Sequence, residues 1–133
     1  MGGHATLKSS AEFAEAKHRV VAAVTQHPSV TFEPDLGAGV RVPIMYHTGT
    51  IDVLTPDSGV TRDYEKVSGP KVLLNLEGAI HFEPVFPPSR WNPSVVSWWS
   101  CYLNLEEGSC GEIRNVCSDD PSADTFADCR VEL

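Results

Sequence analysis

Asp52 and His81 are the residues of this chain whose types and positions best fit acid–base chemistry. Each follows an expected strand, and one expected helix separates them. If the two strands are parallel neighbours, both side chains reach the same edge of the sheet. A carboxylate that accepts a hydrogen bond from one imidazole nitrogen fixes the tautomer of the ring, so that the other nitrogen can act as a general base. The alternative is that Asp52 caps a turn and His81 is a surface loop residue.

Four other residues are weaker candidates for the same chemistry. Asp57 competes for the role of the acid, but it lies at an expected helix start, where a carboxylate interacts favourably with the helix dipole. Ser9 and Ser10 could act as nucleophiles, yet we expect both to face solvent from within a helix. His47 ends an expected strand and is interpreted as structural.

The elements that must position these residues alternate between strands and helices. The expected strands are residues 19–25, 40–46 and 71–76, and the expected helices are residues 3–10 with a continuation to 17, residues 57–66 and residues 93–103. Residues 29–39 are expected to form an irregular loop. Such alternation predicts an α/β fold with parallel strands joined by helical crossovers. In this fold, functional side chains sit on loops at the carboxyl ends of strands.

Composition excludes two classes of function. The chain has 133 residues and a formal net charge of −8, with a sequence pI of about 4.9. Nucleic-acid binders need Lys and Arg to displace counterions from phosphates, so no nucleic-acid partner is expected. No apolar run approaches the roughly 20 residues of a membrane-spanning helix, so no membrane span is expected.

The four cysteines, Cys101, Cys110, Cys117 and Cys129, lie in or just before an acidic C-terminal stretch. Their spacing contains no Cys-x-x-Cys, so no metal site is expected. An even count predicts two disulfides and an oxidising, secretory or extracellular compartment, with all three pairings open. Free thiols in the cytosol are the alternative. Residues 104–133 are expected to form an irregular acidic tail, distinct from residues 1–103.

Three short motifs resemble those of the α/β-hydrolase superfamily, in its dienelactone-hydrolase-like and cutinase/PET-hydrolase-like group. Met1-Gly2-Gly3 is similar to the end of the motif Gly-x-Ser-Met-Gly-Gly, in which the serine is the nucleophile. Residues 48–56 (TGTIDVLTP) resemble the acid loop of that group, and residues 78–84 (GAIHFEP) resemble its histidine loop. The motifs also follow the chain order of that superfamily, which is serine, acid, histidine.

The resemblance implies a role for each matching residue. Asp52 would be the acid and His81 the general base of a Ser-Asp-His triad, and the backbone N–H of Met1 would contribute to the oxyanion hole. His27 would lie where polyester hydrolases place an aromatic residue beside the substrate. Leu54 and Phe82 would line the cleft. The group uses no metal and no organic cofactor.

The serine itself would precede Met1, so the resemblance implies the C-terminal half of an α/β-hydrolase fold, with about three parallel strands. The expected function is that of a fragment of a serine carboxylic-ester hydrolase acting on a small or polymeric ester. The chain alone is expected to be inactive. The alternatives are a peptidase or acyltransferase of the same fold, or a noncatalytic protein that binds a partner through an exposed sheet edge.

Overall fold

Runs of aliphatic and β-branched residues form the central strands of one sheet. In the computed structural model, residues 2–13, 20–30, 33, 35–83, 89–118 and 126–133 are described. Within them the sheet has the order β1 (Ala23–Gln26), β2 (Ile44–Gly49), β3 (Lys71–Leu76), β4 (Phe126–Glu132). Strands β1, β2 and β3 are parallel, and β4 pairs antiparallel with β3. All residues of β2 and β3 are buried, as is typical of parallel strands covered on both faces.

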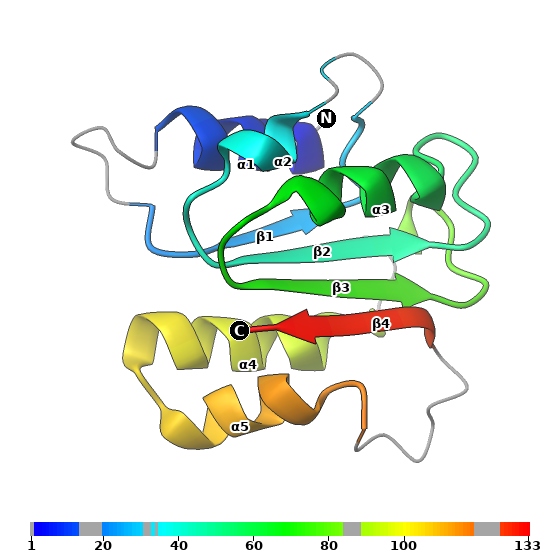
Figure 1. Ribbon diagram of the computed structural model, residues 1–133. Helices are drawn as coiled ribbons and strands as arrows, with labels where there is room; N and C mark the ends of the chain where they lie inside the picture. Colours follow the sequence, from blue (N-terminus) through cyan, green and yellow to red (C-terminus); the bar gives the residue numbers. More distant parts are fainter. Residues whose placement is uncertain (1, 14–19, 31–32, 34, 84–88, 119–125) are drawn as a thin grey trace.

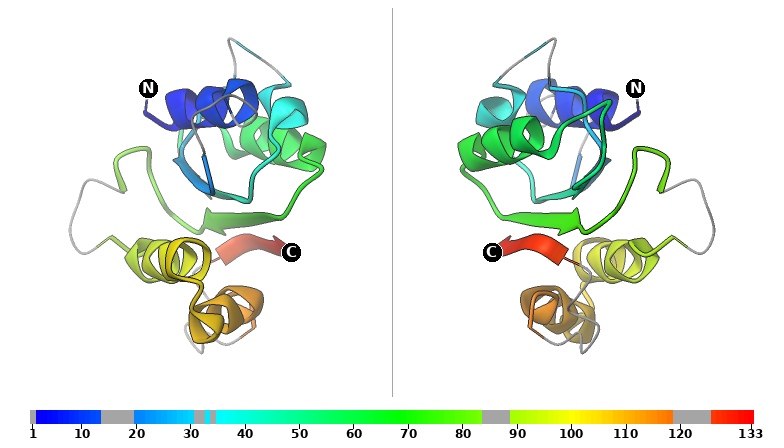
Figure 2. Two further views of the ribbon diagram at one scale, coloured as in Figure 1. Left: turned by 90° about the vertical axis from the view of Figure 1, so that its left-hand side faces the viewer. Right: turned by 90° about the vertical axis from the view of Figure 1, so that its right-hand side faces the viewer.

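Helices cover both faces of this sheet (Figures 1 and 2). On one face lie α1 (Gly2–Glu12), the short α2 (Leu36–Gly39) and α3 (Asp57–Lys66). On the other face lie α4 (Asn92–Asn104) and α5 (Glu107–Asn115). In the described part of the chain, no helix has the length and apolar character needed to cross a membrane.

Two hydrophobic cores lie on opposite faces of the sheet because successive strand residues point in opposite directions. From β2, Ile44 and Tyr46 join the core under α1 and α3, whereas Met45 joins the core over α4 and α5. Strand β3 alternates in the same way. The helices contribute large buried side chains, Leu7 from α1 and Trp98 from α4 among them. Both layers therefore hold the sheet from which the site loops emerge.

The C-terminal stretch differs from the expectation. Residues 104–133 do not form only an irregular tail, because they contain α5 and β4, and the sheet is mixed rather than three parallel strands alone. In β4, Cys129 and Val131 pack against the core over α4 and α5, and they alternate along the strand with the charged residues Asp128, Arg130 and Glu132. This alternation was a strand signal, and covering the free edge of β3 explains why the strand forms there.

The other elements agree with the expectation in kind and differ in their bounds. The expected strand 19–25 corresponds to β1, which begins later in the sequence and is shorter. The expected strand 40–46 corresponds to β2, which also begins later. The helix 57–66 and the strand 71–76 are confirmed. The loop expected over residues 29–39 contains α2, and the expected continuation of the first helix over residues 14–17 lies outside the described residues. Ser10 is buried and donates to the Thr6 carbonyl, so its expected exposure is wrong.

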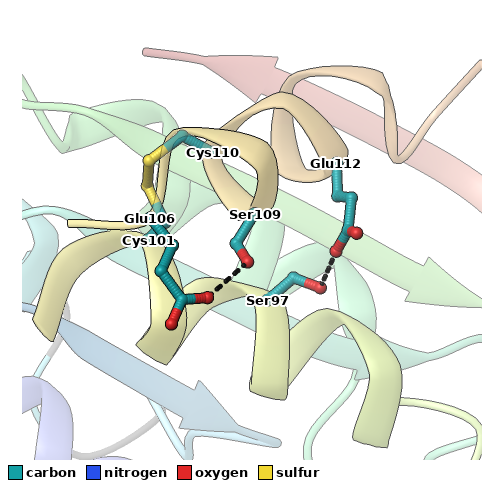
Figure 3. The surroundings of a disulfide bond; sticks show 6 residues. All are labelled: Ser97, Cys101, Glu106, Ser109, Cys110 and Glu112. Carbon is teal, nitrogen blue, oxygen red and sulfur yellow. Dashed lines mark hydrogen bonds between the residues drawn. A yellow bond between two sulfur atoms is a disulfide. The ribbon is translucent and has the colours of Figure 1, made fainter. Parts of the chain in front are cut away.

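Two disulfides join the C-terminal elements. Cys101–Cys110 links α4 to α5, and Cys117–Cys129 links the residues after α5 to β4. Figure 3 shows the first bridge beside two side-chain hydrogen bonds. Ser97 donates to Glu112 at 2.5 Å between the two helices, and Ser109 donates to Glu106 at 3.3 Å. The expectation of two disulfides is confirmed, and the structure selects one of three pairings.

Replacing Cys117 and Cys129 by serine is expected to lower the free energy of unfolding by about 3 kcal/mol, because the bridge limits the unfolded chain. Hydrogen exchange followed by mass spectrometry should show faster exchange in β4, while β2 stays protected. The matched control replaces Cys101 and Cys110, whose bridge does not reach β4. Equal exchange of β4 in the two variants would contradict this role of the second bridge.

Candidate functional site

Three polar side chains lie together at the carboxyl ends of the three parallel strands. His27 follows β1, Asp52 lies on the loop after β2, and His81 lies on the loop after β3. One imidazole nitrogen of each histidine and one carboxylate oxygen of Asp52 all lie within 4.8 Å of one another. The expected approach of Asp52 and His81 is therefore present, and it includes His27 as a third member.

Asp52 is a fully buried carboxylate that its own loop holds in place. Its Oδ1 accepts hydrogen bonds from the backbone N–H groups of Leu54 and Thr55, both at 2.9 Å. Its Oδ2 accepts from the Thr55 hydroxyl at 2.6 Å. Burial by itself raises the pKa of Asp52, but the hydrogen bonds from Thr55, His81 and Leu54 outweigh it and lower the pKa to about 2. Asp52 is therefore ionised at neutral pH.

His81 donates from Nδ1 to Asp52 Oδ2 at 2.9 Å. Since an ionised carboxylate can only accept, this bond places the ring proton on Nδ1 and leaves a lone pair on Nε2. The His81 side chain is 22% exposed, whereas that of Asp52 is fully buried. The Phe82 ring packs edge-on against the His81 ring at 5.5 Å between centroids. The arrangement suits a base that is accessible at one nitrogen and oriented at the other.

His27 is the second histidine on the same carboxylate. Its Nδ1 donates to Asp52 Oδ2 at 2.5 Å, and its side chain is almost completely buried. Its ring packs against Trp91 at 4.7 Å between centroids. Burial lowers the pKa of His27, although the charge of Asp52 opposes that change. His27 is therefore a neutral donor to Asp52, and its contact with a substrate stays a prediction.

A pocket of about 550 Å³ opens beside these residues. Its lining combines the first turn of α1 with the loops after β1, β2 and β3, through His4, Ala5, His27, Ser29, Leu54, Thr55 and His81. Leu54 lines this pocket and is more than half exposed. Phe82 contacts the His81 ring but is not part of the lining. Met1 lies outside the described residues.

The first turn of α1 reaches this pocket because a glycine lets it approach β1 closely. A β-carbon on Gly3 would lie 2.1 Å from the carbonyl oxygen of Gln26. The Gly3 carbonyl accepts a hydrogen bond from the Thr25 hydroxyl at 2.8 Å. These contacts fix the N-terminal end of an 11-residue helix beside the carboxyl end of β1.

A second glycine brings the acid loop and the histidine loop together. A β-carbon on Gly49 would lie 2.3 Å from the Ala79 carbonyl oxygen and 2.7 Å from the Ala79 β-carbon. The same carbonyl accepts a hydrogen bond from the Ile51 N–H at 3.3 Å. The absence of a side chain at Gly49 is therefore required for the approach of Asp52 to His81.

The remaining candidates lie elsewhere. Asp57 begins α3 and accepts a hydrogen bond from Asn75 at 3.0 Å. His47 is buried and stacked on Trp91 at 4.9 Å between ring centroids. Burial, aided by the neighbouring His27, lowers the pKa of His47 to about 3. Both observations agree with structural roles for Asp57 and His47.

The sequence interpretation missed two residues that shape the site. Thr55 donates to Asp52 from both its backbone and its hydroxyl, and Trp91 packs against His27. A threonine three residues after an aspartate is a recognisable turn motif, so Thr55 had a local signal. Trp91 had none, because it reaches the site from the chain segment before α4, far along the sequence.

The three clustered atoms could also ligate a divalent cation, because imidazole nitrogens and a carboxylate are ligands that Zn²⁺ accepts. Both Nδ1 atoms would first have to lose their protons. The N–O distances of 2.5 and 2.9 Å are those of direct hydrogen bonds.

No protein-family model matches this chain, and no curated protein sequence matches it significantly.

Replacing Asp52 by asparagine is expected to reduce the free energy of unfolding by about 2 kcal/mol at pH 7, since the pKa of Asp52 lies about two units below its usual value. The ionised carboxylate stabilises the fold above about pH 4, and this stabilisation is lost as the pH falls toward 2. Urea denaturation at several pH values should therefore show the difference between the two proteins shrinking in acid. A pH-independent difference would contradict the assignment.

Replacing Gly49 by alanine is expected to cost about 2 kcal/mol of stability, because the new β-carbon overlaps Ala79 and forces the two loops apart. NMR should show changes in the His81 ring signals, which report the lost contact with Asp52. Gly111→Ala in α5 is the matched control, since nothing lies within 4 Å of its β-carbon position. Unchanged His81 signals in the Gly49 variant would show that the contact does not need this glycine.

Proposed function

We propose that this chain supplies the acid and the base of a Ser-His-Asp triad in a carboxylic-ester hydrolase of the α/β-hydrolase type. The observation that carries the proposal is the hydrogen bond of 2.9 Å from His81 Nδ1 to a buried, ionised Asp52 beside an open pocket. The order of the two residues along the chain and the motifs around them support it.

The proposed nucleophile is a serine that would precede Met1 in a longer protein. The first turn of α1 lines the same pocket as His81, and this position of the helix start supports the proposal. Among the residues that the structure describes, no serine or cysteine side chain is hydrogen-bonded to His81. The resemblance of Met1-Gly2-Gly3 to the end of a nucleophile motif supports the same position.

In this mechanism His81 Nε2 takes the proton of the serine hydroxyl as its oxygen attacks the ester carbonyl. Asp52 stabilises the imidazolium that forms, and the backbone N–H of Met1 would help to stabilise the oxyanion. The intermediate collapses as His81 returns the proton to the leaving alcohol. Water, activated by His81, then releases the acid from the acyl-enzyme. His81 must be neutral at the start, because Nε2 has to accept the serine proton.

An oxidising compartment fits this proposal. Both cysteine pairs form disulfides, and such bridges persist in secreted and extracellular proteins. We therefore propose the secretory route or the extracellular space as the location of the protein.

The test uses protein expressed with the coding sequence that precedes Met1. We expect a fluorophosphonate probe to label a serine in this longer protein, and the protein to hydrolyse p-nitrophenyl butyrate. The 133-residue chain should do neither. His81→Ala and Asp52→Asn should each lower turnover by more than about a hundredfold. Asp57→Asn, which changes the competing carboxylate, should retain activity.

Unlabelled, inactive longer protein would contradict the proposal. Faster cleavage of p-nitroanilide amides than of esters, or transfer of the acyl group to an added alcohol in preference to water, would instead indicate a peptidase or an acyltransferase with the same two residues.

A second candidate function is the binding of an extended peptide along β1. In the described residues β1 pairs only with β2, so its other edge is free. A groove of about 440 Å³ follows this edge between α1 and Trp99 of α4, and Ala23 and Val24 of β1 line it. Such an edge can accept an added strand. This candidate predicts that the longer protein remains inactive in the assay above.

A further inference from the structure

We propose that His27 is a positioning residue that competes with His81 for one oxygen of Asp52. By this competition His27 weakens the hydrogen bond between His81 and Asp52. This inference rests on the proposed function, because it concerns how the acid acts on the base. It differs from the role that the resemblance implied for His27, which was contact with the substrate.

Asp52 Oδ2 is crowded by hydrogen-bond donors. A carboxylate oxygen has two lone pairs, yet Oδ2 is within hydrogen-bond distance of three donors. These are His27 Nδ1 at 2.5 Å, the Thr55 hydroxyl at 2.6 Å and His81 Nδ1 at 2.9 Å. The contact with His81 is the longest of the three. His81 therefore receives the weakest share of the charge on this oxygen.

The surrounding protein holds His27 in this position. Its ring is buried and packs against Trp91, which also stacks on the ring of His47. The backbone N–H of His27 donates to the His47 carbonyl at 2.9 Å. The backbone φ of His27 is 45°, in the left-handed region that side chains rarely adopt. These constraints aim Nδ1 at Asp52.

Asp52 does not need His27 to stay in place. Two backbone N–H groups hold Oδ1, and the Thr55 hydroxyl holds Oδ2. Loss of the His27 donor should therefore leave the orientation of Asp52 unchanged. With one donor fewer, Oδ2 carries more negative charge toward His81, which strengthens their hydrogen bond and makes His81 Nε2 a better nucleophile.

The experiment measures this nucleophilicity directly on the 133-residue protein, without a serine. Diethyl pyrocarbonate acylates neutral imidazole, and the rate at each histidine can be followed by peptide mass spectrometry at pH 8. His81 and His4 are partly exposed, whereas His27 and His47 are buried. The rate at His4, which lies at the same pocket, shows whether the pocket stays intact.

Two variants of His27 separate donation from packing. His27→Phe keeps a ring against Trp91 and removes the donor. His27→Asn keeps an N–H group near the position of Nδ1, and asparagine tolerates a positive φ. We expect acylation of His81 to be about threefold faster in His27→Phe, because a donor to the carboxylate is lost. It should return close to the wild-type rate in His27→Asn, with His4 unchanged in both.

A slower or unchanged rate at His81 in His27→Phe would overturn the proposal, provided that thermal unfolding shows a folded variant. If His27→Phe does not fold, the acylation rate of His81 is compared between His27→Asn and His27→Leu. A rate in His27→Leu that is not faster than in His27→Asn would then overturn the proposal. Asp52→Asn tests the underlying function separately. A normal rate at His81 in Asp52→Asn would show that Asp52 does not act on His81 at all. A reduced rate there, with no acceleration in His27→Phe, would remove only the role of His27.

Discussion

The buried charge of Asp52 is the constraint on which the site depends. An ionised carboxylate without exposure is stable only when donors surround it, because its desolvation is costly. Here the donors come from three loops, namely two backbone N–H groups and a hydroxyl of its own loop, His27 after β1, and His81 after β3. The hydrogen bonds that stabilise this one charge therefore connect the carboxyl ends of three strands.

The sheet makes that convergence possible. Parallel pairing of β1, β2 and β3 brings their carboxyl ends to one edge, and the full burial of β2 and β3 keeps them in register between two helical layers. Close backbone approaches at Gly3 and Gly49 then bring α1 and the two loops near enough for side chains to meet. A hydrogen bond of 2.9 Å at the site is thus a consequence of packing throughout the sheet.

The C-terminal elements stabilise the sheet at the edge of β3. Strand β4 covers the free edge of β3, and Glu132 near its end accepts a hydrogen bond from Tyr64 of α3 at 3.1 Å and lies 3.4 Å from Lys71 of β3. The disulfides connect α4, α5 and β4. The acidic C-terminal stretch therefore has a structural function, and in the described residues the two edge strands of the sheet are β1 and β4.

The sequence by itself determined the α/β alternation, the bounds of α3 and β3, and the approach of Asp52 to His81, because periodicity and turn residues are local signals and parallel strands share an edge. Only the tertiary structure decided the antiparallel pairing of β4, the disulfide pairing, and the turn of His27 toward Asp52. Each of these depends on contacts between distant segments, such as Trp91 against His27. Neither spacing nor composition encodes such contacts, because they form only when the layers pack.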